Sequence, residues 1–222
     1  MLRLLAMDAD DLTERYFVAL GAAFARGRLP DLGGLPDEDA FRQGLARGLR
    51  LHKFKRNADL PRVRRVLSML AGLAPSSLLD VGSGRGTFLW PLLDAFPELP
   101  VTSIDKDERR ASDLAAAHAG GVARLDAHRM DATALGFTDH AFDGVTALEV
   151  LEHMPDPDRA GRELVRVATR FVLATVPSKP DDNPEHLHLF HDARLVAMFT
   201  AAGARSVRVD HVHGHIVALA LL

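Results

Sequence analysis

The sequence predicts an α/β protein with one open, Rossmann-like, seven-stranded sheet that is mostly parallel, carries helices on both faces and follows a helical N-terminal extension. Three observations support this fold class. From residue 77 onward, short runs rich in Val, Leu and Ile alternate with helix-length amphipathic stretches. The first run leads into a glycine-rich loop. The last two runs are separated only by a turn at Gly214, so they should pair antiparallel with the final strand reversed.

Length and composition limit the possible functions. The 222 residues, of which 47% are hydrophobic, suffice for one α/β domain with a modest extension. A formal net charge of -3 gives no global reason to expect nucleic acid or an acidic membrane as the main partner. The absence of cysteine excludes disulfides and thiol nucleophiles, and no export signal or membrane-spanning apolar run is seen. We therefore expect a soluble, cytoplasmic protein.

Residues 1–60 are predicted to form a helical extension that acts as a lid for a domain at residues 61–222. Apolar residues recur there at i+4 spacing on both sides of a Gly/Pro-rich break. They are Leu12, Tyr16, Leu20 and Phe24 before the break and Phe41, Leu45 and Leu49 after it. Basic residues gather at 42–65, which indicates either a solvated helix face or a patch for an anionic substrate.

The remaining elements follow in order along the chain. Strands are expected near residues 77–81, 101–105, 126–130, 142–148, 170–176, 205–212 and 215–221. Helices are expected near residues 61–73, 86–95, 107–118, 157–168 and 192–202. Trp90, the only tryptophan, is expected in the core, and the alternating His211, His213 and His215 are expected to form a stripe on the surface.

The glycine loop after the first strand indicates a ligand site. Gly82, Gly84 and Gly86 allow the backbone to bend sharply and to approach a ligand closely. Their spacing differs from the Gly-x-Gly-x-x-Gly of dinucleotide-binding loops, which disfavours a nicotinamide-dependent oxidoreductase. Asp80, two residues before the first glycine, would repel a pyrophosphate but suits a ligand that carries an ammonium group.

Two further acids extend this site. Asp105 ends the second strand about 20 residues after the loop, where a carboxylate can accept hydrogen bonds from both hydroxyls of a ribose. Met130, Asp131 and Ala132 follow the third strand, where a short acid and its neighbouring backbone can hold an adenine edge. Asp131 can equally be a turn-forming or helix-capping carboxylate. The ligand is thus predicted to be a nucleoside.

In this order and spacing, the motifs resemble those of the class I S-adenosylmethionine-dependent methyltransferases over residues 61–222. The fourth strand adds Phe142-Asp143-Gly144-Val145, and the reversed final strand also matches. The resemblance implies that Asp80 and the glycines hold the methionine part of S-adenosyl-L-methionine, that Asp105 holds its ribose, and that Asp131 with Met130 and Ala132 holds its adenine.

The fourth strand delivers Glu149, Glu152 and His153 at its carboxyl end, where open α/β sheets bind ligands. If this segment turns helically, the three side chains share one face. They could then coordinate a divalent ion, or His153 alone could act as a general base. We expect His153 and Glu149 to be catalytic, with Glu149 also beside the cofactor. A histidine-rich stretch at residues 184–191 lies on the same side of the sheet.

The Glu-x-x-Glu-His pattern resembles two branches of this superfamily. The run Leu-Glu-His-Met-Pro-Asp-Pro at residues 151–157 is similar to one found in the ubiquinone-biosynthesis type of O-methyltransferase. The other branch is the small-RNA 3′-end 2′-O-methyltransferases, and it implies a Mg or Mn site. The implied ligands are Glu149, Glu152, His153 and His188.

The leading prediction is an O-methyltransferase for a small hydroxylated metabolite, with His153 as base or metal ligand. In the alternative, the basic segment 42–65 grips RNA phosphates and a ribose hydroxyl accepts the methyl group. A cofactor-binding scaffold without catalysis is a further alternative. No motif indicates the acceptor or the oligomeric state.

Overall fold

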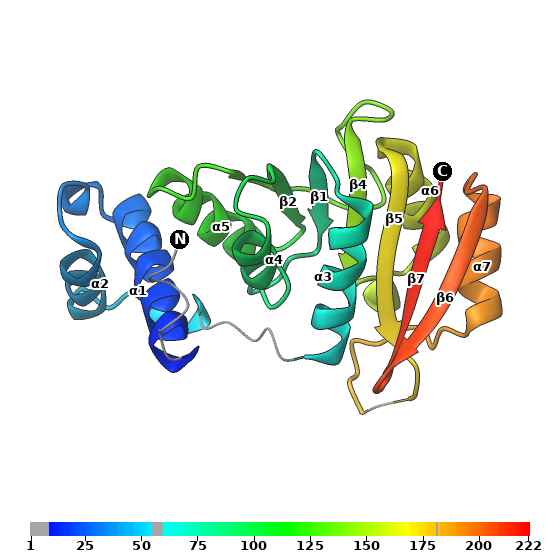
Figure 1. Ribbon diagram of the computed structural model, residues 1–222, viewed down its shortest axis with the longest axis horizontal. Coiled ribbons are helices and arrows are strands. Elements are labelled where there is room, and N and C mark those ends of the chain that lie inside the picture. Colours follow the sequence, from blue (N-terminus) through cyan, green and yellow to red (C-terminus); the bar gives the residue numbers. More distant parts are fainter. Residues whose placement is uncertain (1–8, 55–59, 181) are drawn as a thin grey trace.

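A computed structural model describes residues 9–54, 60–180 and 182–222. A seven-stranded sheet runs through it in the order β3-β2-β1-β4-β5-β7-β6 (Figure 1). The strands are β1 (Leu78–Val81), β2 (Val101–Asp105), β3 (Leu125–Arg129), β4 (Phe142–Leu148), β5 (Ala168–Pro177), β6 (Ser206–Val212) and β7 (His215–Leu221). Paired strands are parallel except that β7 is antiparallel to β5 and β6. The predicted fold class, with its reversed final strand, is confirmed.

The helices also lie close to their predicted positions. They are α1 (Ala9–Arg28), α2 (Asp37–Ala46), α3 (Pro61–Leu73), α4 (Leu89–Ala95), α5 (Glu108–Ala119), α6 (Pro157–Val167) and α7 (Asp192–Ala201), with short 3-10 turns η2 (Pro30–Leu32), η3 (Leu51–Phe54) and η4 (Leu151–His153). Helix α4 begins at Leu89 rather than at residue 86, because Gly84 and Gly86 have φ values of +58° and +84°, which a right-handed helix excludes.

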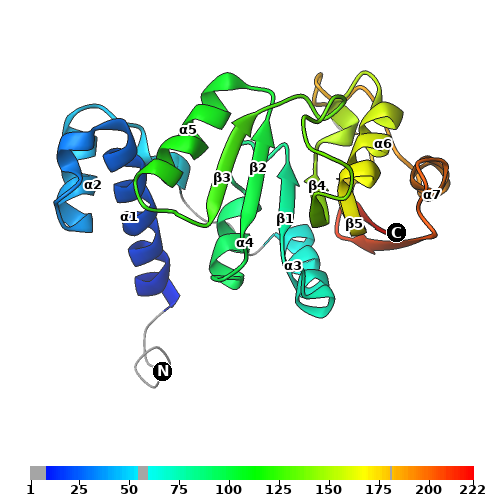
Figure 2. The same ribbon diagram turned by 90° about the horizontal axis from the view of Figure 1, so that it is seen from above.

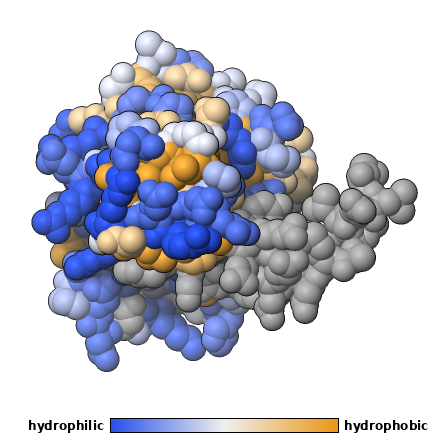
Figure 3. Space-filling model, turned by 90° about the vertical axis from the view of Figure 1, so that its left-hand side faces the viewer, coloured by the Kyte–Doolittle hydropathy of each residue, from blue (hydrophilic) through white to orange (hydrophobic). Residues whose placement is uncertain are grey.

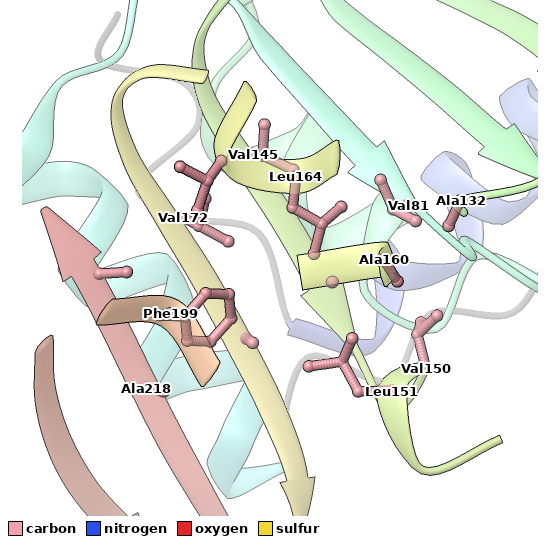
Figure 4. Close-up of a cluster of buried hydrophobic side chains, with 14 of the residues drawn as sticks. Val81, Ala132, Val145, Val150, Leu151, Ala160, Leu164, Val172, Phe199 and Ala218 are labelled. Carbon is pink, nitrogen blue, oxygen red and sulfur yellow. The ribbon is translucent and has the colours of Figure 1, made fainter. Parts of the chain in front are cut away.

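Helices cover both faces of the sheet, as predicted. On one face, α3, α4 and α5 bury a cluster that includes Val66, Trp90 and Leu114. On the other face, α6 and α7 bury Leu164 and Phe199 against the strands (Figure 4). Figure 2 shows α3 and α4 on the opposite side of the sheet from α6. The predicted core position of Trp90 is confirmed, since its side chain is almost fully buried.

The N-terminal helices pack at the end of the molecule beyond α5 (Figure 1). Helix α1 approaches the end of α5 closely because glycines lie at the contact. A Cβ on Gly27 of α1 would lie 1.9 Å from the Ala116 carbonyl oxygen, and a Cβ on Gly120, which follows α5, would lie 1.6 Å from that of Ala23. Leu20 and Phe24 are buried in this region, as their spacing predicts. Leu45 continues the i+4 spacing in α2 but is 49% exposed, because α2 ends one residue later at the margin of the molecule.

Within the described residues, no helix has both the length and the apolar character that crossing a bilayer requires.

Candidate functional site

A cavity of about 950 Å³ opens at the carboxyl ends of β1, β2 and β4. This is the edge at which parallel α/β sheets bind ligands, and the volume suits a nucleoside with a second small molecule. The lining residues include Asp80, Gly84, Asp105, Glu149 and His153. The structure therefore brings the predicted cofactor loop and the predicted catalytic edge into one cleft.

The glycines of the loop serve different purposes. All three have positive φ, +71° at Gly82, +58° at Gly84 and +84° at Gly86. A Cβ on Gly82 would meet the Val150 side chain at 2.5 Å, and one on Gly86 would meet the Trp90 indole at 2.0 Å, so these two glycines permit tight packing beneath the loop. A Cβ on Gly84 meets nothing nearer than 3.8 Å and would project into open space. Gly84 is thus the position at which backbone can approach a ligand.

Asp80 lines the cavity from beneath the loop, with only 2% of its surface exposed. The hydroxyl groups of Thr146 and Ser83 donate hydrogen bonds to its two carboxyl oxygens, the first over 2.8 Å. Burial raises the pKa of Asp80 to about 6, and the two hydroxyl donors limit the rise. Its position links the first strand, the loop and β4.

Asp105 stands at the end of β2 on the other side of the loop. The backbone N–H of Gly84 donates to its Oδ2 and that of Asp107 donates to its Oδ1, both over 2.9 Å. Arg110 lies 3.9 Å from Oδ2. These donors fix the carboxylate beside the glycine that approaches the cleft, at the position predicted for a ribose contact.

The segment after β3 completes this half of the cleft. The backbone N–H of Met130 donates to the carbonyl of Asp105, Ala132 is buried, and Asp131 is exposed. The N–H and the hydroxyl of Thr133 both donate to Oδ1 of Asp131 over 2.8 Å and hold the pKa of that carboxyl below its ordinary value. Asp131 therefore makes the hydrogen bonds of a turn-forming carboxylate, which was one of the two roles considered from the sequence. It also lines the cleft, as the other role requires.

Glu149 lies where β4 ends and has φ of +57°, a left-handed conformation that costs a non-glycine residue about 1 kcal/mol. Its N–H donates to the carbonyl of Thr175, whose hydroxyl donates to Oε1 over 2.8 Å. His215 Nε2 is 3.0 Å from Oε2, and Arg62 Nε is 3.9 Å from Oε1. Burial works against the charged form of Glu149, yet the bonds from His215 and Thr175 hold its pKa below the ordinary value.

His153 ends the 3-10 turn η4 and lines the cavity. Its Nδ1 lies 2.9 Å from the carbonyl oxygen of Glu185. A carbonyl only accepts, so Nδ1 carries the proton and Nε2 of the neutral ring keeps its lone pair. Nε2 lies 4.0 Å from Oε1 of the buried Glu152.

The four-residue metal set predicted from the resemblance is not brought together. Because Glu149 is left-handed and only the residues from Leu151 onward turn helically, Glu149 points to Thr175 and His215 and does not share a face with Glu152 and His153. Nε2 of His188 lies 2.9 Å from the carbonyl oxygen of Met154.

A different group converges instead. Ligand atoms of Glu152, His153 and His186 all lie within 4.8 Å of one another, the only such group among the residues that the structure describes. The N–H groups of Leu187 and His188 donate to the carbonyl of Glu152, which ties the histidine-rich loop to η4. His186 was not singled out, although its place in the histidine-rich stretch was a signal.

The basic segment 42–65 forms ion pairs with acids. In its described part, Arg42 pairs with Asp39, Arg47 with Asp31 and Arg65 with Asp210, at 3.2, 2.6 and 2.6 Å. The surface around α1 and α2 is largely hydrophilic (Figure 3). These pairs are those of a solvated face, while Lys55 and Arg56 lie outside the described residues. Contact of this segment with RNA stays a hypothesis.

Comparisons with known proteins agree with this geometry. A family model described as a methyltransferase domain matches residues 79–170. The malonyl-[acyl-carrier protein] O-methyltransferase of Geobacter sulfurreducens is 32% identical over 178 residues, which cover 69% of this chain and 66% of that protein. The ubiquinone biosynthesis O-methyltransferase of Pseudomonas paraeruginosa is 35% identical over 120 residues, which cover 50% of this chain and 48% of that protein. The chain spans about half the length of the curated relatives it matches.

Solved structures agree on the fold. The crystal structure of a SAM-dependent methyltransferase from Aquifex aeolicus has a TM-score of 0.58 at 20% identity, covering 74% of this chain and 91% of that chain. Fold and cleft together define an α/β domain of the kind that binds nucleosides at the carboxyl edge of its sheet. Within that class, the chain belongs to the class I S-adenosylmethionine-dependent methyltransferases. This membership replaces the alternative of a nicotinamide-dependent oxidoreductase.

Proposed function

We propose that this protein transfers the methyl group of S-adenosyl-L-methionine to an oxygen atom of a small hydroxylated metabolite, with His153 as the general base. The observation that carries the proposal is the hydrogen bond from Nδ1 of His153 to the Glu185 carbonyl, which leaves Nε2 as a proton acceptor at the cavity. Relatives named as O-methyltransferases support oxygen as the acceptor atom.

The residues around the loop fit the cofactor. Open space above Gly84 allows close approach of the methionine part, and the carboxylate of Asp105 next to it suits the two ribose hydroxyls. The adenine then lies beside Met130, Asp131 and Ala132. Asp80 supports the loop through Ser83 from below.

When bound, the cofactor supplies a methyl group on a sulfonium, and the sulfur keeps the electron pair of the broken carbon–sulfur bond as the new carbon–oxygen bond forms. His153 accepts the hydroxyl proton on Nε2, and the Glu152 carboxyl at 4.0 Å stabilises the resulting imidazolium. Glu149 is a poor base because His215 and Thr175 already donate to it. Its carboxylate instead orients groups at the boundary between the cofactor and the acceptor.

The test is methyl transfer from labelled S-adenosylmethionine to a panel of phenols, alcohols and carboxylic acids. His153→Ala should lower the rate on any accepted compound about a hundredfold or more, while calorimetry gives an unchanged affinity for S-adenosylhomocysteine. The matched control is His213→Ala, since His213 is exposed on the terminal hairpin. Full activity in His153→Ala would refute the role of the base.

The convergence of Glu152, His153 and His186 favours a second candidate, in which these three side chains would hold a divalent metal that would supply Lewis-acid activation of the acceptor hydroxyl. One carboxylate and two imidazoles suit Mn, Fe or Zn better than Mg. On this proposal, elemental analysis of the purified protein finds about one metal per chain, and His186→Ala loses it. A metal-free protein whose activity survives chelation would exclude this candidate.

A further inference from the structure

The terminal hairpin contacts the cavity-lining Glu149 through His215, the first residue of β7. Nε2 of His215 lies 3.0 Å from Oε2 of Glu149, and Nδ1 lies 3.0 Å from the carbonyl oxygen of His213. Both ring nitrogens therefore face acceptors, and only the doubly protonated imidazolium can donate to both. The hydrogen bond to Glu149 also raises the pKa of His215. His215 was expected on a surface stripe, yet its side chain is only 21% exposed.

Glu149 depends on groups that are far from it in the sequence. Its backbone is left-handed, so the carboxylate direction is not set by a helix or strand of its own. The side chain is held by Thr175 from β5, by His215 from β7 and, less closely, by Arg62 from α3. Thr175 binds one carboxylate oxygen and His215 binds the other, so together they fix the plane of the group.

We propose that His215 is a positioning residue that keeps the carboxylate of Glu149 charged and aimed at the boundary between the cofactor and the acceptor. This inference rests on the proposed function and deepens it. His215 does not line the cavity, whereas Glu149 does, so His215 acts through Glu149. Without His215, Arg62 is the one remaining cation beside Glu149 among the described residues, and Oε2 loses its donor.

The experiment is a double-mutant cycle read by calorimetry with S-adenosylhomocysteine and with S-adenosylmethionine. Glu149→Gln and His215→Ala should each weaken binding about tenfold. In the Glu149→Gln background, His215→Ala should have no further effect, because its role passes through the lost carboxylate. His215→Gln, which keeps an N–H donor, should recover most of the affinity, and His213→Ala is the matched control.

An NMR titration of the His215 imidazole supplies a ligand-free readout. Glu149→Gln should lower the pH midpoint of the His215 titration, because the hydrogen bond that raises its pKa is weakened. The proposal is overturned if the midpoint does not move, if His215→Ala leaves binding intact, or if its loss is the same in both backgrounds. These outcomes are distinct from failure of the proposed function, which would appear as methyl transfer that is indifferent to His153.

Discussion

The cleft has two halves that are assembled differently. In the half formed by the ends of β1, β2 and β3, contacts are made largely by backbone groups of short, continuous motifs, as in the bond from Gly84 to Asp105. In the half formed by the carboxyl ends of β4 and β5 and by the start of β7, the central Glu149 is held by Thr175 and His215, which come from two other strands.

The difference shows how each half is encoded. Short sequence motifs specify the first half, because each glycine or acid lies at the end of a strand or in the loop directly after it. The second half depends on the sheet order, since β7 lies next to β5 only after the last strand has reversed. We therefore expect substitutions in the first half to change cofactor affinity directly. Substitutions in the second half should act through the neighbouring side chains that hold Glu149.

The largest expected effect is that of Gly84→Val. A branched side chain at φ of +58° is strained and would project into the open space above the loop, so affinity for S-adenosylhomocysteine should fall at least about a hundredfold in calorimetry. Gly48→Val is the control, because Gly48 has φ of +85° with open space around it and lies at the end of α2. Equal losses in both variants would mean that strain alone is responsible.

An intermediate effect is expected at Asp80, whose pKa rises from 3.8 to about 6 on folding. Between these values the folded state holds more protons, so this contribution to stability is present at low pH and is lost as the pH rises through 6. Its contribution to the unfolding free energy should be about 1 kcal/mol smaller at about pH 8 than at about pH 5.

Asp80→Asn removes this titration. Denaturant unfolding at the two pH values measures the unfolding free energy of both proteins. Relative to the parent, the variant should be more stable at about pH 8 than at about pH 5, by about that amount. Glu98→Gln, an exposed carboxyl, serves as the control. A difference that does not depend on pH would contradict the buried, partly protonated state of Asp80.

The smallest effect is expected for Thr133→Val. This change removes the hydroxyl that donates to Asp131 but keeps the backbone donor, so cofactor affinity should fall only about threefold. Thr169→Val, which removes an exposed hydroxyl bonded to the His140 carbonyl, should leave affinity unchanged. A tenfold loss at Thr133 would mean that Asp131 is less firmly held by the backbone than its geometry indicates.

The sequence predicted the strands, the glycine loop and the acids at Asp80, Asp105 and Asp131, because strand periodicity and loop chemistry are local. It did not predict the left-handed backbone of Glu149, so the helical turn on which a shared face with Glu152 and His153 depended does not include Glu149. It also missed His215 and His186, whose positions depend on the hairpin and on the loop anchored at η4. The lid at residues 1–60 stays a prediction, since none of the described residues among them lines the cavity.

The placement of β7 makes the outer edge of the sheet and one edge of the cleft depend on the same strand. Strand β6 joins the sheet only by pairing with β7, although it is synthesised first. The attachment of β6 to the sheet therefore requires that β7 pair with β5. Since His215 opens β7, a substitution that frays the start of this strand would loosen β6 and remove a donor of Glu149 at the same time.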